Sequence, residues 1–294
     1  MTTLVHVVVA GVLVGGLYGL ISSGLSLSFG ITRLVNFAHG DFVTIGMYLF
    51  VATVASQGAI GLLLAPVFAI AIGALGMLFY ALFLGRAVVA AVSEEEAHTP
   101  QIVITAAASV FIQSGLLAVF TSTARSAGGV LDQSIDLGGI VMPVPQLVAF
   151  AVALAVFAFF DAVVNHTEFG RALRAVVDDA DAAALVGVSR RTVYALSFGI
   201  GAAMAGLAGV LLSTYEPVTP QTGADYLAIA FVTVVLGGLG SIRGAFIAGL
   251  IIGTVQQAAA TYVALDLQNE FLWATFIVLL LLRPSGLFGR PVTA

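Results

Sequence analysis

The sequence predicts an all-α protein that crosses a membrane several times as a polytopic helix bundle. Hydrophobic residues make up 60% of the 294 residues and charged residues only 9%, and the mean hydropathy is +1.12. Soluble domains carry roughly a quarter charged residues, so this chain lacks the surface that water requires. Long apolar runs recur along the whole chain, and we therefore expect residues 1–294 to form a single transmembrane domain.

The apolar runs define the expected helices. A helix needs roughly 20 apolar residues to cross the hydrocarbon core, which predicts eight to ten transmembrane helices here, with about nine as the central value. Three short or Gly-interrupted runs, 42–57, 226–241 and 271–283, are candidates for half-spans or re-entrant segments. The sequence shows no recognisable internal repeat. The runs lie at about 5–30, 42–57, 60–84, 102–120, 144–164, 194–214, 226–241, 244–264 and 271–283.

The arginines predict the orientation. The chain has no Lys, and when the segment around Arg33 is placed in the cytoplasm and the sides alternate, only Arg125 of the ten Arg lies outside. Basic residues concentrate on the cytoplasmic side of membrane proteins. We therefore expect an external N-terminus, a cytoplasmic C-terminus and external loops at 121–142 and 215–225, in a multi-pass protein of the inner or plasma membrane.

Several classes of chemistry are absent from the sequence. Without Lys the chain cannot form a P-loop, and without Cys it has no thiolate ligand or nucleophile. The four His share no metal-ligand spacing, and no hydrolase motif occurs. The glycines of 237–244 join two apolar runs, which predicts a tight turn and not a dinucleotide site. We expect no catalytic residue, cofactor, metal ion or nucleic-acid partner.

Small residues recur at four-residue intervals in two of the expected helices. Gly11, Gly15 and Gly19 lie on one face of the first helix, and Gly249 and Gly253 repeat the spacing near the C-terminus. Small residues allow close helix packing in lipid. The pattern predicts packing within one bundle, and the alternative is that the first helix packs against a second subunit.

A polar cluster interrupts the apolar chain at TRLVNFAHGDF, residues 32–42. Asn36 and His39 would share a helix face, and a charge at mid-membrane costs roughly 2.5–3.5 kcal/mol. Three interpretations remain: an ordinary cytoplasmic turn with Arg33 facing lipid phosphates, a broken segment lining the inner end of a translocation path, or a contact with another subunit. The candidates for the path or its inner gate are Asn36, His39, Asp41 and the uncharged polar residues Tyr18, Ser22 and Gln113.

The longest polar interval, residues 165–193, predicts a short cytoplasmic helix. Asp178 and Asp179 favour a helix N-terminus, Ala182 and Ala183 are strong helix formers, and Gly187 suits the C-terminal end. A surface helix on lipid headgroups is the alternative. The carboxylates, with Asp181 among them, fit an anionic leaflet poorly, so a protein partner explains the segment better.

This interval resembles a known family of proteins. DAAALVG, residues 181–187, resembles the E-A-A-x-x-x-G signature of importer-type ABC permeases. Four blocks are similar to permeases of branched-chain amino-acid (Liv-type) importers: GLYGLISSGLSLSFGITRLVNFAHGDF, FGRALRAVVDDADAAALVGVSRRTVYALSFGIGAAMAGLAGVLL, VVLGGLGSIRGAFIAGLIIG and LLRPSGLFGR. The chain departs from the family at Arg33, Asp41 and Arg243.

The resemblance implies a permease subunit and not an enzyme. It implies that Asp178, Asp179, Asp181, Ala182, Ala183 and Gly187 form a coupling helix that docks into an ATPase. It also implies a second homologous permease in a heterodimer or homodimer, two cytoplasmic ATPase subunits and an extracytoplasmic binding protein. Branched-chain or related amino acids would be the cargo. The alternative is a stand-alone channel or ion-coupled carrier, and the position of the charges at the ends of the expected helices counts against it.

Overall fold

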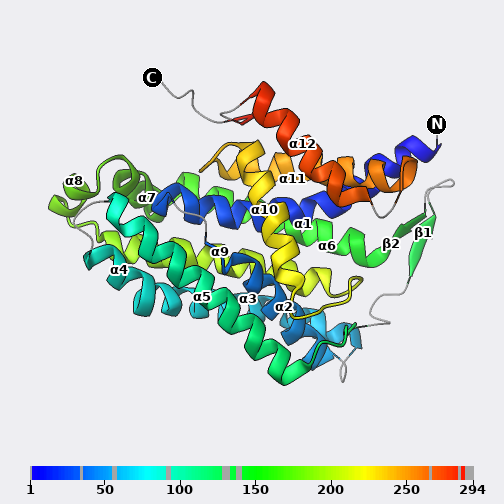
Figure 1. Ribbon diagram of the computed structural model, residues 1–294, viewed down its shortest axis with the longest axis horizontal. Helices are drawn as coiled ribbons and strands as arrows, with labels where there is room; N and C mark the ends of the chain where they lie inside the picture. Colours follow the sequence, from blue (N-terminus) through cyan, green and yellow to red (C-terminus); the bar gives the residue numbers. More distant parts are fainter. Residues whose placement is uncertain are drawn as a thin grey trace.

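The structure is a bundle of helices elongated along the direction of its longest members (Figure 1). It is a computed structural model that describes residues 2–33, 36–54, 58–90, 94–127, 133–136, 141–264, 267–283 and 286–288. The helices are α1 (Thr2–Thr32), α2 (His39–Val54), η1 (Gly58–Leu64), α3 (Ala65–Phe79), η2 (Tyr80–Leu84), α4 (Gly85–Ala90), α5 (Glu94–Phe120), α6 (Val144–His166), α7 (Glu168–Asp178), α8 (Ala180–Leu185), α9 (Arg190–Leu212), α10 (Thr222–Gly237), α11 (Ile242–Tyr262) and α12 (Gln268–Leu282). A short antiparallel pair, β1 (Ser134–Asp136) and β2 (Val141–Pro143), is the one departure from an all-α fold within these residues.

The structure confirms a multi-pass membrane protein. Six helical stretches among the described residues are long and apolar enough to cross a membrane. Two of the three runs predicted to be partial spans form the shorter apolar helices α10 and α12. The total of nine transmembrane helices stays a prediction. The six stretches are Thr3–Thr32, Gly61–Ala87, His98–Phe120, Val144–His166, Arg190–Leu212 and Ile242–Tyr262.

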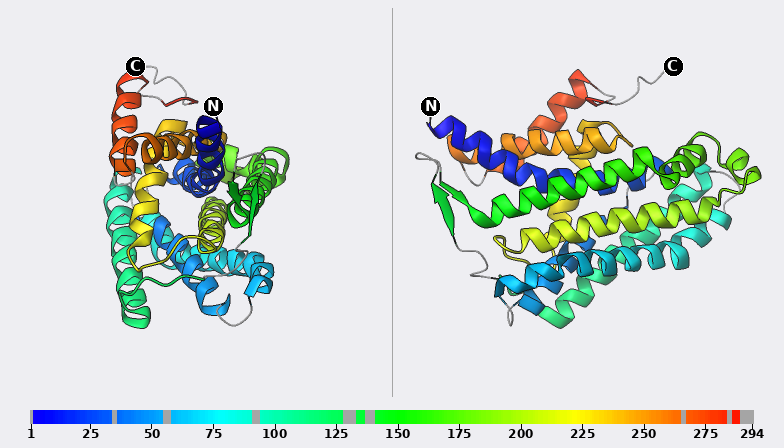
Figure 2. Two further views of the ribbon diagram at one scale, coloured as in Figure 1. Left: turned by 90° about the vertical axis from the view of Figure 1, so that its right-hand side faces the viewer. Right: turned by 180° about the vertical axis from the view of Figure 1, so that it is seen from behind.

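The loops fall into two groups at opposite ends of the bundle. At one end His6 is hydrogen-bonded to the backbone oxygen of Val141, and Arg125 pairs with Val218 through their backbones. Figure 2 shows the N-terminus and the β-strands at this end, and α7 and α8 at the other. The segments predicted to be external therefore share one end. Which end faces the cytoplasm stays a prediction.

The small-residue faces pack inside the bundle. A methyl group added to Gly15 would lie 2.7 Å from the carbonyl oxygen of Gly249, and one added to Gly253 would lie 2.5 Å from the Cα of Gly15. Gly11 and Gly19 face α11 in the same way. The alternative that this face of the first helix meets a second subunit is wrong, because α11 covers it.

Two groups of three helices repeat the same arrangement. Helix α1 packs antiparallel to α11, and α3 packs antiparallel to α9 in the same way. The two central helices, α1 and α9, cross where Gly24 and Gly201 touch reciprocally. The short helices α2 and α10 meet in the same reciprocal way at Gly40 and Gly223. The segments α1–α2–α3 and α9–α10–α11 therefore correspond as an inverted repeat, which the sequence does not reveal. In transporters such repeats hold the substrate site at their interface.

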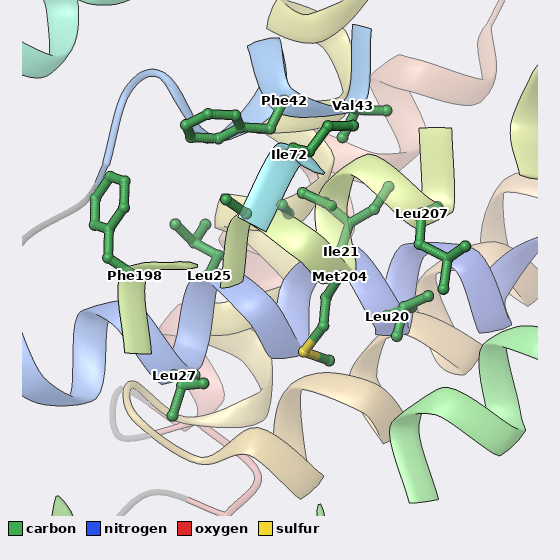
Figure 3. Packing of buried hydrophobic residues seen from close by; sticks show 14 of the residues in the cluster. Leu20, Ile21, Leu25, Leu27, Phe42, Val43, Ile72, Phe198, Met204 and Leu207 are labelled. Atoms are coloured by element: carbon green, nitrogen blue, oxygen red, sulfur yellow. The ribbon is translucent and has the colours of Figure 1, made fainter. Parts of the chain in front are cut away.

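The core lies between these two groups. Figure 3 shows Ile21 and Leu25 of α1 packed near Met204 of α9 and Ile72 of α3. All four side chains are almost completely buried. Because lipid provides no hydrophobic drive for helix association, such close packing and the glycine contacts hold the bundle together.

Candidate functional site

Helix α2 begins inside the bundle and not at its end. His39, its first residue, donates a hydrogen bond from Nε2 to the backbone oxygen of Ile21, at 3.0 Å. From Ile21, α1 continues for about 16 Å to its end at Thr32. The connection between α1 and α2 therefore brings the start of α2 back beside the middle of α1.

The polar residues of this connection are enclosed by protein. Asn36 is 5% exposed, and His39 and Asp41 are each 1% exposed. Asn36 accepts a hydrogen bond from the backbone N–H of Ala38 at 3.1 Å. The interpretation as an ordinary turn facing lipid phosphates is wrong for these three residues. Arg33 and Phe37 are exposed, and the backbone of Arg33 has a positive φ of 53°.

Asp41 is joined to a helix far away in the sequence. The Nε2 of Gln113, in α5, donates to Oδ1 of Asp41 at 3.1 Å and to Oγ of Ser109 at 3.0 Å. The structure thus brings together two residues that the sequence placed in the same functional group. Asp41 lies in the first turn of α2, where the helix dipole favours a carboxylate.

The cluster keeps unused hydrogen-bonding capacity. Within the described residues, the buried atoms Oδ2 of Asp41, Nδ1 of His39 and Oγ1 of Thr44 have no hydrogen-bond partner. A buried polar atom without a partner costs about 1–3 kcal/mol. The protein keeps these unpartnered atoms at the start of α2, next to its contact with α10. The start of α2 is therefore a candidate functional element.

Asp41 combines two positions that bear on the class of transporter. It lies at a helix end, in the first turn of α2, as the sequence predicted for the charges. It is also buried within the bundle, with 1% of its surface exposed. Intramembrane carboxylates are typical of carriers, so the distribution of charge does not exclude that class.

Tyr18 and Ser22 belong to a different group. The hydroxyl of Ser22 donates to the backbone oxygen of Tyr18 at 2.6 Å, as is usual for Ser in membrane helices. The ring of Tyr18 packs against Tyr226 of α10, with centroids 6.3 Å apart. Sequence reasoning missed Tyr226 and its neighbours Tyr215 and Glu216. Their concentration in one short polar interval is the signal that could have identified them.

The polar interval after α6 forms two helices, where one was predicted. Asp179 caps α8, since its Oδ1 accepts hydrogen bonds from the backbone N–H groups of Asp181 at 3.0 Å and Ala182 at 2.9 Å. Gly187 has the predicted left-handed backbone, with φ of 87°. Asp178 was expected at the start of the short helix, but it is the last residue of α7. The extra helix, α7, is amphipathic, with Leu173 and Val176 buried, and this pattern within a polar interval was the signal that was missed.

The tip of α8 exposes apolar side chains at the end of the bundle. Leu185 is 90% exposed and Val186 is 79% exposed, whereas Ala183 is buried against the rest of the chain. Asp178, Asp179, Asp181, Ala182 and Gly187 are all exposed around this tip. An apolar tip that projects beyond the bundle is typical of a protein-binding surface.

Comparison with known proteins identifies the family. Residues 7–282 match the family described as the branched-chain amino acid transport system / permease component. The chain is 30% identical to the high-affinity branched-chain amino acid transport system permease protein LivH of Salmonella typhimurium, over 96% of this chain and 94% of that protein. It is 29% identical to the corresponding protein BraD of Pseudomonas aeruginosa, over 96% and 95%.

The similarity also extends to proteins with other names. A probable branched-chain amino acid transport permease protein LivM of Methanocaldococcus jannaschii is 30% identical over 46% of this chain and 44% of its own length. No solved structure matches the chain. Because the family match spans nearly all the helices described above, this chain belongs to the branched-chain amino acid transport permease family.

Proposed function

We propose that this chain is the permease subunit of an ATP-driven, binding-protein-dependent importer of branched-chain amino acids. The observation that carries the proposal is the family match over residues 7–282. The exposed tip of α8 supports it, because an importer permease needs a surface through which an ATPase can act. The names of LivH and BraD give branched-chain amino acids as the cargo of those relatives.

The coupling path runs from α8 into the centre of the bundle. In this proposal Leu185 and Val186 enter a cleft of the ATPase, and the acidic side chains of α8 meet its rim. Residues 186–189 join α8 directly to α9, and Ser189 caps α9 through the N–H of Thr192. Helix α9 packs against α1, α2 and α3. A displacement of α8 would therefore move the interface between the two repeats and open the path alternately to each side.

The remaining partners follow from the family. A second homologous permease would complete the translocation path, and the similarity to a LivM protein is compatible with a heterodimer. Two cytoplasmic ATPase subunits would dock at the α7–α8 end. An extracytoplasmic binding protein would dock at the end that carries β1 and β2. In this arrangement His39, Asp41, Asn36 and Gln113 act at the path or its inner gate.

Charge reversal at Asp181 tests the proposal. The side chain is exposed, and only its backbone N–H is bonded to Asp179, so Asp181→Lys leaves the helix cap intact. We expect ATP-dependent leucine uptake to be abolished while the amount of protein in the membrane stays normal. Glu270→Lys, an exposed acid in the first turn of α12, is the control and should transport normally.

An ion-coupled carrier is the second candidate, and the buried carboxylate of Asp41 is the observation that favours it. The two functions differ in what drives transport. Vesicles that contain this chain alone should take up no leucine when an ion gradient is imposed. Uptake at the full rate without ATPase subunits would contradict the importer and establish the carrier.

A further inference from the structure

Three tyrosines and one carboxylate gather where α10 begins. Tyr18 comes from α1, Tyr226 from α10, and Tyr215 and Glu216 from the turn that follows α9. The rings of Tyr18 and Tyr226 are inclined by 58° with centroids 6.3 Å apart. Burial raises the pKa of Tyr215 well above its ordinary value, and Tyr18 and Glu216 raise it further. Tyr18 and Glu216 thus both lie within electrostatic range of the Tyr215 hydroxyl.

Two features of this group are unexplained by the fold. The hydroxyl of Tyr215 is buried and has no hydrogen-bond partner among the described residues. The carboxylate of Glu216 has no ion pair in the part of the chain that the structure describes, although the surrounding protein raises its pKa by burial. A partly buried carboxylate without a counterion beside aromatic rings is a site for a cation.

We propose that Tyr18, Tyr215, Glu216 and Tyr226 form a subsite that binds the ammonium group of the transported amino acid. This inference rests on the proposed function and specifies how its cargo is recognised. The carboxylate supplies the opposite charge, the ring faces attract a cation, and the phenol oxygens accept hydrogen bonds from an ammonium group. The same group disfavours anions and offers little to a solute without a positive charge.

The position in the fold agrees with this role. Helix α10 runs across the direction that α1, α6 and α9 follow (Figures 1 and 2). Its first turn meets the first turn of α2 at Gly223 and Gly40. Transporters place substrate sites where interrupted helices begin inside the bundle. Glu216 is exposed, so a solute can reach its carboxylate.

An apolar surface lies beside the tyrosines. Tyr18 and Tyr226 pack against a buried cluster that includes Ile229, Val232 and Ile252. An amino acid held by its ammonium group at Glu216 would therefore have aliphatic side chains within the same region of the bundle. This arrangement suits a cargo with a charged head and an apolar side chain.

The test uses the complete importer, with both permeases, the ATPases and the binding protein, in lipid vesicles. A diazirine analogue of leucine is photolysed during ATP turnover, and the labelled peptides are identified by mass spectrometry. We expect label within residues 215–226 that excess leucine prevents. The α-keto acid of leucine, which lacks the ammonium group, should not prevent it.

Variants then separate recognition from folding. Glu216→Gln should reduce both the labelling and leucine uptake by about fivefold to thirtyfold, the effect of one lost charge or cation–π contact. Tyr215→Phe removes only the unpartnered hydroxyl and should reduce uptake in the same direction. ATP hydrolysis stimulated by the loaded binding protein should stay near its wild-type rate. Glu270→Gln, an exposed acid outside the group, is the matched control.

The outcomes distinguish the two proposals. Wild-type uptake and labelling in Glu216→Gln, or equal competition by the keto acid, would overturn the ammonium subsite alone. A wild-type complex that shows no ATP-driven leucine uptake would overturn the proposed function and the subsite together. Label in 215–226 that is lost in Glu216→Gln and kept in Glu270→Gln supports both.

Discussion

Asp41 is a carboxylate whose charge and hydrogen bond can be separated by substitution. One oxygen accepts from Gln113 at 3.1 Å, and the other has no partner in the described residues. An amide in its place still offers an acceptor to Gln113. Asp41→Asn therefore tests the charge, and Asp41→Ala tests the charge and the hydrogen bond together.

We expect Asp41→Asn to fold normally and to lower leucine uptake about tenfold, the effect of roughly 1.4 kcal/mol. Asp41→Ala should in addition lower the free energy of unfolding by about 1–3 kcal/mol, because a buried hydrogen bond is broken. Thermal unfolding in detergent and initial uptake rates measure the two effects. Normal uptake by Asp41→Asn would show that the negative charge has no part in transport.

Glu216 gives a pH dependence whose sign follows from its environment. Burial raises its pKa above the ordinary 4.5. Glu216 lies within electrostatic range of Tyr18, Tyr215 and Tyr226, and Asp225 is a further neighbour of Tyr226. Tyr215 stays neutral, since its pKa is also raised. Protonation removes the charge that we assign to the ammonium group. Leucine uptake should therefore fall as the pH drops through a value above 4.5, and Glu216→Gln should abolish this step.

The same raised pKa has the opposite effect on stability. The folded protein binds this proton more tightly than the unfolded chain does, so acidification through the raised pKa stabilises the fold. Loss of uptake in this range cannot then be attributed to unfolding through Glu216. Asp225→Asn serves as a control, and a pH step unchanged in Glu216→Gln but lost in Asp225→Asn would contradict the assignment.

At the scale of the single helix, α8 is defined by its ends. Asp179 caps its start and Gly187 follows its end with φ of 87°, so a helix of only six residues keeps its shape without burial on most sides. The exposed Leu185 and Val186 are then held in a fixed orientation. This is the rigidity that the proposed coupling to an ATPase requires.

Leu185→Asp should prevent ATPase subunits from co-purifying with the permease, because a charge would have to be buried at the interface without a partner. The measurement is the ratio of ATPase to permease after affinity purification. Arg171→Ala is the control, since its ion pair with Glu168 is exposed and contributes little. Full ATPase content in Leu185→Asp would refute docking through this tip.

The contact between α1 and α11 depends on the absence of side chains. A methyl group at Gly15 would already lie 2.7 Å from the carbonyl oxygen of Gly249. We expect Gly15→Leu to separate the helices and to destabilise the fold by about 1–3 kcal/mol or more. Gly115→Leu in α5 is a matched control, since nothing lies within 4 Å of a methyl group there. Equal thermal stability of the two variants would contradict this packing.

At the scale of the whole molecule, the two groups of loops make the orientation testable. The natural chain has no Cys, so each introduced Cys is the only reactive thiol. A membrane-impermeant maleimide applied to intact cells should label Ser134→Cys in β1, which is exposed. It should label Ala182→Cys in α8 only after the membrane is permeabilised. The reverse pattern would invert the orientation and remove α8 from the ATPase.

Local patterns determined much of this protein without its structure. Composition and the apolar runs predicted a multi-pass membrane protein, and Asp179 and Gly187 predicted the two ends of the short helix. These features depend on residues close together in the chain. The same holds for the four sequence blocks from which the permease family was predicted.

Only the tertiary structure decided which distant residues meet. Asp41 and Gln113 are 72 positions apart, and Tyr18 meets Tyr226 across two helices. The reciprocal contacts of Gly24 with Gly201 and of Gly40 with Gly223 define a repeat that leaves no trace in the sequence. In lipid nearly every face of a helix is apolar, so hydrophobicity does not specify its neighbours. The crossing of the helices, fixed by glycine contacts and buried polar groups, determines where the candidate site lies.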